Sequence, residues 1–120
     1  MTHNYLMGIT VEKTNASCGA YVTGIDLSQK ISDDLGGLLR EHWLENKVLI
    51  FPDQNLTDDD LENFTLAFGE FGDDPFFGHI DGHQNIAAIQ RDPNETTPIF
   101  AEVFHTCLLY TSDAADDGYR

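Results

Sequence analysis

Short apolar segments separated by polar residues open the chain. Residues 5–14 (YLMGITVEKT) and 20–27 (AYVTGIDL) are rich in β-branched and aromatic side chains, and residues 15–19 (NASCG) between them have the composition of a turn. Apolar runs of this kind, bounded by Gly, Asn and Ser, are typical of strands. The pattern therefore predicts two strands joined by a tight turn.

Two amphipathic helices are predicted next. Over residues 33–46 leucines and a tryptophan recur every three or four positions, and Ser32 precedes them as an N-cap. Thr57 caps the second helix, whose first turn holds three aspartates and whose apolar face runs to Gly69. Acidic residues in a first turn are favoured by the helix dipole. On the first helix, His42 is expected at the surface.

The remaining segments predict further strands and one long loop. Residues 47–54 (KVLIFPDQ) form a continuous apolar run, which indicates a strand buried on both faces in the centre of a sheet. Residues 70–85 are rich in Gly, Pro and Asp and predict a loop, the kind of segment that often carries function. The last two strand candidates are residues 86–90 and 98–104, separated by a turn. No internal repeat or second domain is predicted.

Composition excludes several classes of function. The 120 residues carry 21 acidic and 6 basic side chains, a formal charge of −15, which opposes binding to nucleic acid or to anionic lipid. No run reaches the roughly 20 apolar residues that span a bilayer, and the N-terminus lacks the pattern of a secretory leader. Two cysteines, Cys18 and Cys107, make no disulfide framework. A soluble, cytoplasmic protein is expected.

Two histidine segments are candidates for metal binding. Residues 78–83 (GHIDGH) contain His79, Asp81 and His83, and a small metal-binding protein that uses these three side chains is one hypothesis. Gly78 and Gly82 place them on a loop, which favours solvent-exposed histidines without a ligand. The second segment ends in His105. A non-catalytic binding module is the other alternative to an enzyme.

The last fourteen residues differ in character from the rest. Residues 107–120 read CLLYTSDAADDGYR, and the codons TGT CTC TTA TAC ACA TCT GAC GCT GCC GAC of a sequencing-library adapter encode Cys107 through Asp116. We therefore expect residues 1–106 to be natural and residues 107–120 to be a foreign tail. The natural part keeps 18 acidic and 5 basic residues, so its charge is −13 after removal of Asp113, Asp116, Asp117 and Arg120 from the totals.

Residues 19–106 resemble the N-terminal part of the TauD/TfdA family of iron(II)- and 2-oxoglutarate-dependent dioxygenases. GAYVTGIDL resembles the opening Gly-Ala-x-(Val/Ile)-x-Gly-(Val/Ala)-Asp-Leu stretch of the family, and KVLIFPDQNLT resembles its strand-to-helix unit. VFHT resembles the start of the Trp-His-(Thr/Ser)-Asp iron triplet. Pro52 stands where the family usually has arginine, and Phe104 where it has tryptophan.

The resemblance implies a fold and a cofactor. The fold would be α+β but mainly β, an incomplete double-stranded β-helix, or jelly roll, with two flanking helices. Fe(II) would be held by two histidines and one carboxylate, with 2-oxoglutarate as cosubstrate. His105 would be the first metal ligand, and Cys107 occupies the position expected to be aspartate. The second histidine and the arginine that binds 2-oxoglutarate would lie downstream, so this chain is expected to be inactive.

The resemblance also implies where a substrate would bind. Such enzymes use O2 to hydroxylate a small organic compound, often an anion, and release succinate and CO2. Positions that contact the sulfonate in taurine-oxidising relatives are occupied here by Asp74, Phe77 and Ala101. An acidic side chain would repel a sulfonate, which argues against taurine. The full-length parent could form a homo-oligomer.

Overall fold

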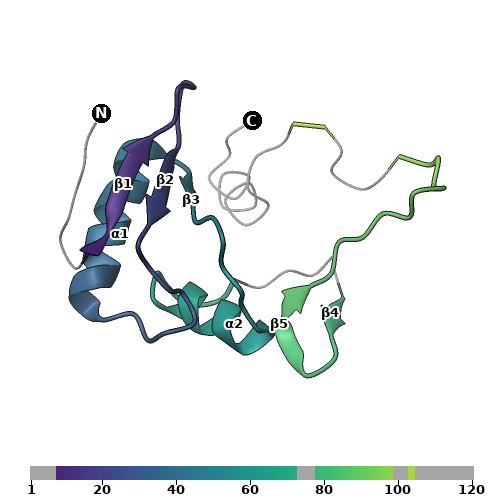
Figure 1. Cartoon of the computed structure of the whole chain (residues 1–120). Coiled ribbons are helices and arrows are strands. Elements are labelled where there is room, and N and C mark those ends of the chain that lie inside the picture. Colours follow the sequence, from purple (N-terminus) through teal and green to yellow (C-terminus); the bar gives the residue numbers. More distant parts are fainter. Residues whose placement is uncertain (1–7, 73–77, 99–102, 105–120) are drawn as a thin grey trace, which may run out of the picture. The chain divides into compact units, whose positions relative to one another are not determined.

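The structure, a computed structural model, describes residues 8–72, 78–98 and 103–104. The chain divides into two compact units, residues 1–70 and residues 71–120. Figure 1 shows the elements of both units in the colours of the sequence. No described helix is long and apolar enough to cross a membrane.

A three-stranded sheet forms the centre of the first unit. Strand β1 (Thr10–Lys13) pairs antiparallel with β2 (Ala20–Thr23), with Val11 opposite Val22. The predicted turn is closed by Thr14, whose backbone N–H donates to the carbonyl oxygen of Gly19 at 3.0 Å. Strand β3 (Leu49–Ile50) then pairs parallel to β2. The predicted hairpin is confirmed.

Helix α1 (Asp33–Asn46) connects β2 to β3, as a parallel pair of strands requires. Its N-terminus is capped as predicted, because the Ser32 hydroxyl accepts the backbone N–H of Leu35 at 3.2 Å. The helix ends where Lys47 adopts a positive φ of 72° and donates its backbone N–H to Trp43 at 2.7 Å. Both ends of α1 are therefore fixed by local hydrogen bonds.

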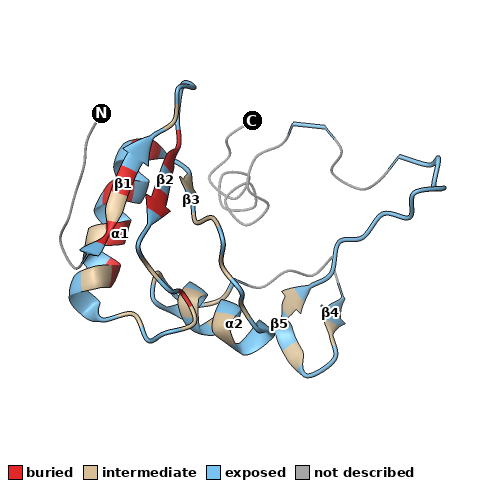
Figure 2. Cartoon of the chain, in the orientation of Figure 1, coloured by how far each residue is buried: buried red, intermediate tan, exposed pale blue. Residues whose placement is uncertain are grey.

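The core of the first unit lies between α1 and the β1/β2 hairpin. Its members are apolar residues with at most 2% of their surface exposed: Ile9, Val11, Ala20, Val22 and Leu39. Figure 2 shows this buried set on β1, β2 and α1, whereas β3 and α2 are half-buried or exposed. Burial of this apolar surface is the main favourable contribution to the folding of the unit.

Helix α2 (Asp58–Leu66) begins at the predicted N-cap, Thr57, which forms a reciprocal capping box with Asp60. The Thr57 hydroxyl accepts the backbone N–H of Asp60 at 3.1 Å, and the Asp60 carboxylate accepts that of Thr57 at 3.0 Å. Edge-to-face ring contacts join Phe64 to Phe51 of the β3 segment, with centroids 5.4 Å apart, and to Phe68, at 5.1 Å. These aromatic contacts pack α2 beside β3.

Two predictions about the first unit are wrong. Among the described residues β3 is an edge strand rather than a central one; Ile50 on it is 37% exposed, and Val48 immediately before it is 48% exposed. The reason is that, within the described part of the chain, β3 pairs with β2 alone and no strand pairs with its other edge. His42 is buried rather than at the surface, because it lies on the same face of α1 as Leu39 and Asn46.

The described part of the second unit is a hairpin. Strands β4 (His79–Ile80) and β5 (His83–Ala87) pair antiparallel around Asp81 and Gly82, within the segment predicted to be a loop. The predicted strand at residues 86–90 is present only where β5 reaches Ala87. The last predicted strand spans residues 98–104. Its described residues, 98, 103 and 104, are not in a strand, and residues 99–102 lie outside the described residues. None of the described residues of this unit is buried.

Candidate functional site

Most residues predicted to form the active site lie outside the described part of the chain. These are His105 and Cys107 at the predicted iron site and Asp74, Phe77 and Ala101 at the predicted substrate positions. The described chain reaches Val103 and Phe104 immediately before the predicted metal ligand, and both side chains are exposed. Their roles remain predictions from the resemblance.

The alternative metal motif lies on the β4/β5 hairpin. His79 is exposed, and its ring Nδ1 lies 3.0 Å from the carbonyl oxygen of Ile80, the distance of an N–H donation to the neighbouring backbone. His83 is half-buried at the start of β5, and Asp81 lies in the turn. Within the described hairpin, these three side chains do not bring one ligand atom each within 4.8 Å of one another. The hairpin in this arrangement is therefore not a preformed metal site.

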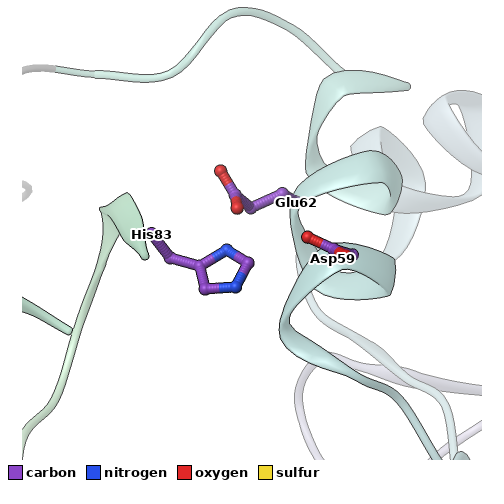
Figure 3. Close-up of side chains that lie close together, drawn as sticks. All are labelled: Asp59, Glu62 and His83. Carbon is purple, nitrogen blue, oxygen red and sulfur yellow. The ribbon is translucent and has the colours of Figure 1, made fainter. Parts of the chain in front are cut away.

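The acidic first turns of α2 carry Asp59 and Glu62, which Figure 3 shows as sticks together with the ring of His83. Asp59 and Glu62 belong to the first unit and His83 to the second. Within a single unit, therefore, only the two carboxylates of Asp59 and Glu62 are placed relative to each other, about one helical turn apart on α2. Asp58, Asp59 and Asp60 all lie in the first turn of α2. Carboxylates near a helix N-terminus are stabilised by the helix dipole, which explains this acidic segment without a ligand.

A side-chain clamp joins the two sequence segments that carry the family resemblance. Gln54, after β3, accepts the backbone N–H of Leu27 through Oε1 at 2.9 Å. Its Nε2 donates to the carbonyl oxygen of Ile25, also at 2.9 Å. One half-buried amide thus satisfies a donor and an acceptor of the loop that follows β2. Sequence reasoning missed this contact, because the partners are 27 and 29 positions apart.

A cavity of about 390 Å³ lies beside this clamp. Its walls come from the loop after β2 and the turn after β3: Thr23, Gly24, Ile25, Asp26, Pro52, Asp53 and Gln54. A hydrogen bond from the Ser28 hydroxyl at 2.6 Å, with a second from the Ser28 backbone N–H at 3.0 Å, holds the pKa of Asp26 below its ordinary value. Both carboxylates in the wall are exposed, so the cavity is a solvated depression that the clamp shapes.

Comparison with known proteins decides the family. The sequence model of the taurine catabolism dioxygenase TauD, TfdA family matches residues 10–116. The chain belongs to this family. The match includes β1, β2, both helices, the Gln54 clamp and the segment that ends in His105. The resemblance seen in the three sequence motifs is confirmed.

Two curated relatives are (S)-phenoxypropionate/alpha-ketoglutarate-dioxygenases. That of Sphingobium herbicidovorans is 45% identical over 56 residues, which are 46% of this chain and 19% of the relative. That of Delftia acidovorans is 39% identical over 62 residues, which are 51% of this chain and 20% of the relative. This chain of the TauD/TfdA family therefore spans about a fifth of the length of these relatives.

Solved structures agree with the family assignment. A taurine dioxygenase from Burkholderia xenovorans is 34% identical, with a TM-score of 0.59 over 69% of this chain and 31% of the other. AAD-2, solved in complex with Mn(II) and N-oxalylglycine, is 26% identical, with a TM-score of 0.52 over 54% of this chain and 26% of the other. The described fold, with its two helices and small sheets, is consistent with part of such a domain.

Proposed function

We propose that this chain is the N-terminal part of an Fe(II)- and 2-oxoglutarate-dependent dioxygenase. The parent enzyme hydroxylates a small organic substrate, often an anion, and releases succinate and CO2. Its fold is a jelly roll of which this chain supplies an incomplete portion with two flanking helices. The observation that carries the proposal is the family match over residues 10–116, which includes the Phe104-His105-Thr106 segment.

His105 is the proposed first ligand of the iron. The chain itself does not complete a site of two histidines and one carboxylate, because Cys107 offers a thiol where the carboxylate is expected. No second histidine follows His105 in the sequence. A metal held by so few ligands exchanges them for water, so we propose that this chain alone has no turnover. The described residues then serve as scaffold, in which Gln54 fixes the loop after β2 against the β3 segment.

The proposed origin of residues 107–120 explains the cysteine. If these residues are translated adapter sequence, we expect the natural gene to encode aspartate at position 107, although the family match runs to residue 116 of the chain as given. Sequencing the locus from a library prepared by another method tests this. An aspartate codon supports the proposal, whereas a cysteine codon followed by natural coding sequence through Arg120 contradicts it.

The substrate is proposed to be a small organic compound other than taurine. Asp74 stands at a position expected to face the sulfonate in taurine-oxidising relatives, and a carboxylate there disfavours a sulfonate. The relatives from Sphingobium and Delftia are named for (S)-phenoxypropionate, a propionate that bears a phenoxy group. Phenoxypropionate and taurine are therefore the two substrates to compare first.

The deciding experiment uses the full-length parent, expressed from the resequenced gene and supplied with Fe(II). We expect oxygen consumption that depends on 2-oxoglutarate and is faster with phenoxypropionate than with taurine. His105→Ala should lower this rate by more than about 100-fold, since even the residues behind a metal ligand contribute about 10–100-fold. His79→Ala, the matched control on the β4/β5 hairpin, should keep the parent rate. Loss of activity in His79→Ala with retention in His105→Ala would place the metal at the hairpin instead.

A further inference from the structure

The turn of the β4/β5 hairpin joins an aspartate directly to a glycine. Ile80 pairs with His83, so only two residues connect the strands, Asp81 and Gly82. Among the described residues Asp81 is the only aspartate that a glycine follows. Both turn residues are exposed, and Figure 2 shows no buried residue on this hairpin. Water can therefore reach the Asp81 carboxyl group and the peptide bond that follows it.

The groups on either side of this peptide bond are unhindered. Gly82 has a positive φ of 80°, and a Cβ built on it would meet no atom within 4 Å. Because glycine has no side chain, its backbone nitrogen is accessible in most conformations. The Asp26 carboxylate accepts two hydrogen bonds from Ser28, whereas no hydrogen bond or ion pair holds the Asp81 carboxylate within the part of the chain that the structure describes. The Asp81 carboxyl group can therefore turn toward the Gly82 nitrogen.

We propose that Asp81 is a site of spontaneous isoaspartate formation. The Gly82 backbone nitrogen attacks the side-chain carboxyl carbon of Asp81, a C–N bond forms, and the amide proton leaves with a carboxyl oxygen as water. The product is a cyclic imide, a succinimide. Water then attacks the main-chain carbonyl carbon of Asp81 and breaks its bond to the Gly82 nitrogen, so that the backbone runs through the former side chain. The sequence releases and then consumes one water, and it needs no oxidant, reductant or metal.

The modification changes the hairpin that contains it. An isoaspartate adds a methylene group to the main chain and leaves a free carboxylate on the turn. The length of a two-residue turn sets the register of the strands beside it, so the longer backbone disturbs the pairing of Ile80 with His83. A hairpin of two strands is marginally stable in water, and none of its residues is buried. The folded hairpin therefore offers little resistance to the reaction and loses its pairing afterwards.

Asp53 is the matched aspartate of the first unit. It is exposed in the turn after β3 and has a positive φ of 59°, but the residue that follows it is Gln54. The amide of the Gln54 side chain bonds to the loop after β2 through both its oxygen and its nitrogen, which restrains the backbone that would have to move. If exposure alone decided the reaction, both aspartates would react. The proposal predicts that of these two only Asp81 does.

The whole chain, incubated without metal at neutral pH and physiological temperature, provides the test, which depends on neither iron nor turnover. Peptide mapping with electron-transfer fragmentation distinguishes isoaspartate from aspartate. We expect isoaspartate at residue 81 to form at a rate within about tenfold of that in a free peptide of residues 78–84, because the uncovered hairpin opens easily. Asp117, which also precedes a glycine but lies outside the described residues, is read in a separate peptide. No isoaspartate at residue 81, or as much at Asp53, would overturn the proposal.

Three variants test the chemistry of the turn. Gly82→Ala should slow the reaction at least about fivefold, because a left-handed alanine is disfavoured and its methyl group hinders the attacking nitrogen. Gly78→Ala is the matched control, since a Cβ there also meets no atom within 4 Å but Gly78 does not follow an aspartate, and it should leave the rate unchanged. Asp81→Asn keeps the size of the side chain and releases ammonia instead of water, so isoaspartate should form faster. An unchanged rate in Gly82→Ala, or a slower one in Asp81→Asn, would contradict the proposed attack.

NMR of the converted chain tests the effect on the hairpin. Cross-strand contacts between Ile80 and His83 should disappear as isoaspartate accumulates. Those between Val11 and Val22, in the first unit, should remain and show that the rest of the fold is intact. Contacts between Ile80 and His83 that persist in the fully converted chain would refute the predicted loss of pairing.

Discussion

The β1/β2 hairpin and the β4/β5 hairpin are both short antiparallel pairs, yet only the first contributes to a core. Val11 and Val22, opposite each other in β1 and β2, are at most 2% exposed. In β4 and β5 the apolar residues Ile80 and Ile86 are only half-buried, and no described residue of that unit is buried. The two hairpins thus differ in burial although both contain β-branched apolar residues.

The difference lies in what covers each hairpin. Along the chain, β2 is followed by α1, whose Leu39 face packs on the strands and encloses them. After β5 the described chain continues through residues 88–98 without a helix or strand. An isolated two-stranded hairpin is marginally stable in water. We therefore expect the first unit to hold its own structure and the second to depend on residues beyond those described.

Amide hydrogen exchange should give the largest contrast between the hairpins. Amides that bond across β1 and β2 are expected to exchange at least about a thousandfold more slowly than in an unfolded chain, which is an opening free energy of about 4 kcal/mol. Amides of β4 and β5 should be slowed less than about tenfold. Exchange of the intact chain read by NMR provides the measurement. Equal protection of both hairpins would show that the second is as well covered as the first.

Removing one core side chain should destabilise the first unit strongly. Leu39 is 0% exposed, so Leu39→Ala leaves a cavity and should lower the free energy of unfolding by about 2–5 kcal/mol. Leu44→Ala, on the same helix at 61% exposure, should change it by less than about 0.5 kcal/mol. Urea unfolding followed through Trp43, the single tryptophan, reports both variants. Similar losses for the two leucines would refute the position of the core.

Glycine substitutions compare the two units at nearly equal backbone φ. Gly24 and Gly82 have φ angles of 78° and 80°. A Cβ on Gly24 would lie 2.3 Å from the carbonyl oxygen of Gly8, whereas a Cβ on Gly82 would meet nothing within 4 Å. Gly24→Ala should therefore cost more than the roughly 1–2 kcal/mol of a left-handed alanine, and Gly82→Ala no more than that.

Thermal unfolding followed by circular dichroism measures the glycine pair. We expect a clear fall in the midpoint for Gly24→Ala and almost none for Gly82→Ala, because the strain at Gly82 is confined to the β4/β5 turn. A larger fall for Gly82→Ala would mean that this turn, and not the contact of Gly24 with Gly8, limits the stability of the chain.

Local signals in the sequence were enough to predict part of this fold. Ser32 and Thr57 cap the two helices as expected, since a cap and the first turn it serves lie within four residues. The turn between β1 and β2 was also predicted correctly, because it is closed by a local hydrogen bond from Thr14 to Gly19. The family, too, could be identified, because three of its motifs occur in order along residues 19–106, and the family model matches residues 10–116.

Contacts between distant residues were beyond sequence reasoning. The edge position of β3 depends on which strands pair with it, and the burial of His42 depends on which face of α1 meets the sheet. The Gln54 clamp joins residues at least 27 positions apart and has no local signature. The predicted site at His105 and Cys107 lies outside the described residues, so it stays a prediction from the resemblance.

The smallest expected effect concerns Asp26, in the loop after β2, which Gln54 joins to the segment after β3. The Ser28 hydroxyl and backbone N–H bond to its carboxylate, so its pKa is lower in the folded chain than in the unfolded chain. A group with a lowered folded pKa stabilises the fold fully above its unfolded pKa, and that contribution is lost as the pH falls through the folded pKa.

Ser28→Ala should raise the pKa of Asp26 toward its ordinary value, as read from an NMR titration of the carboxyl carbon. Ser32→Ala, which removes a hydroxyl from the α1 cap instead, should leave this titration unchanged. An unaltered Asp26 titration in Ser28→Ala would show that the loop after β2 is no more ordered in solution than an exposed turn.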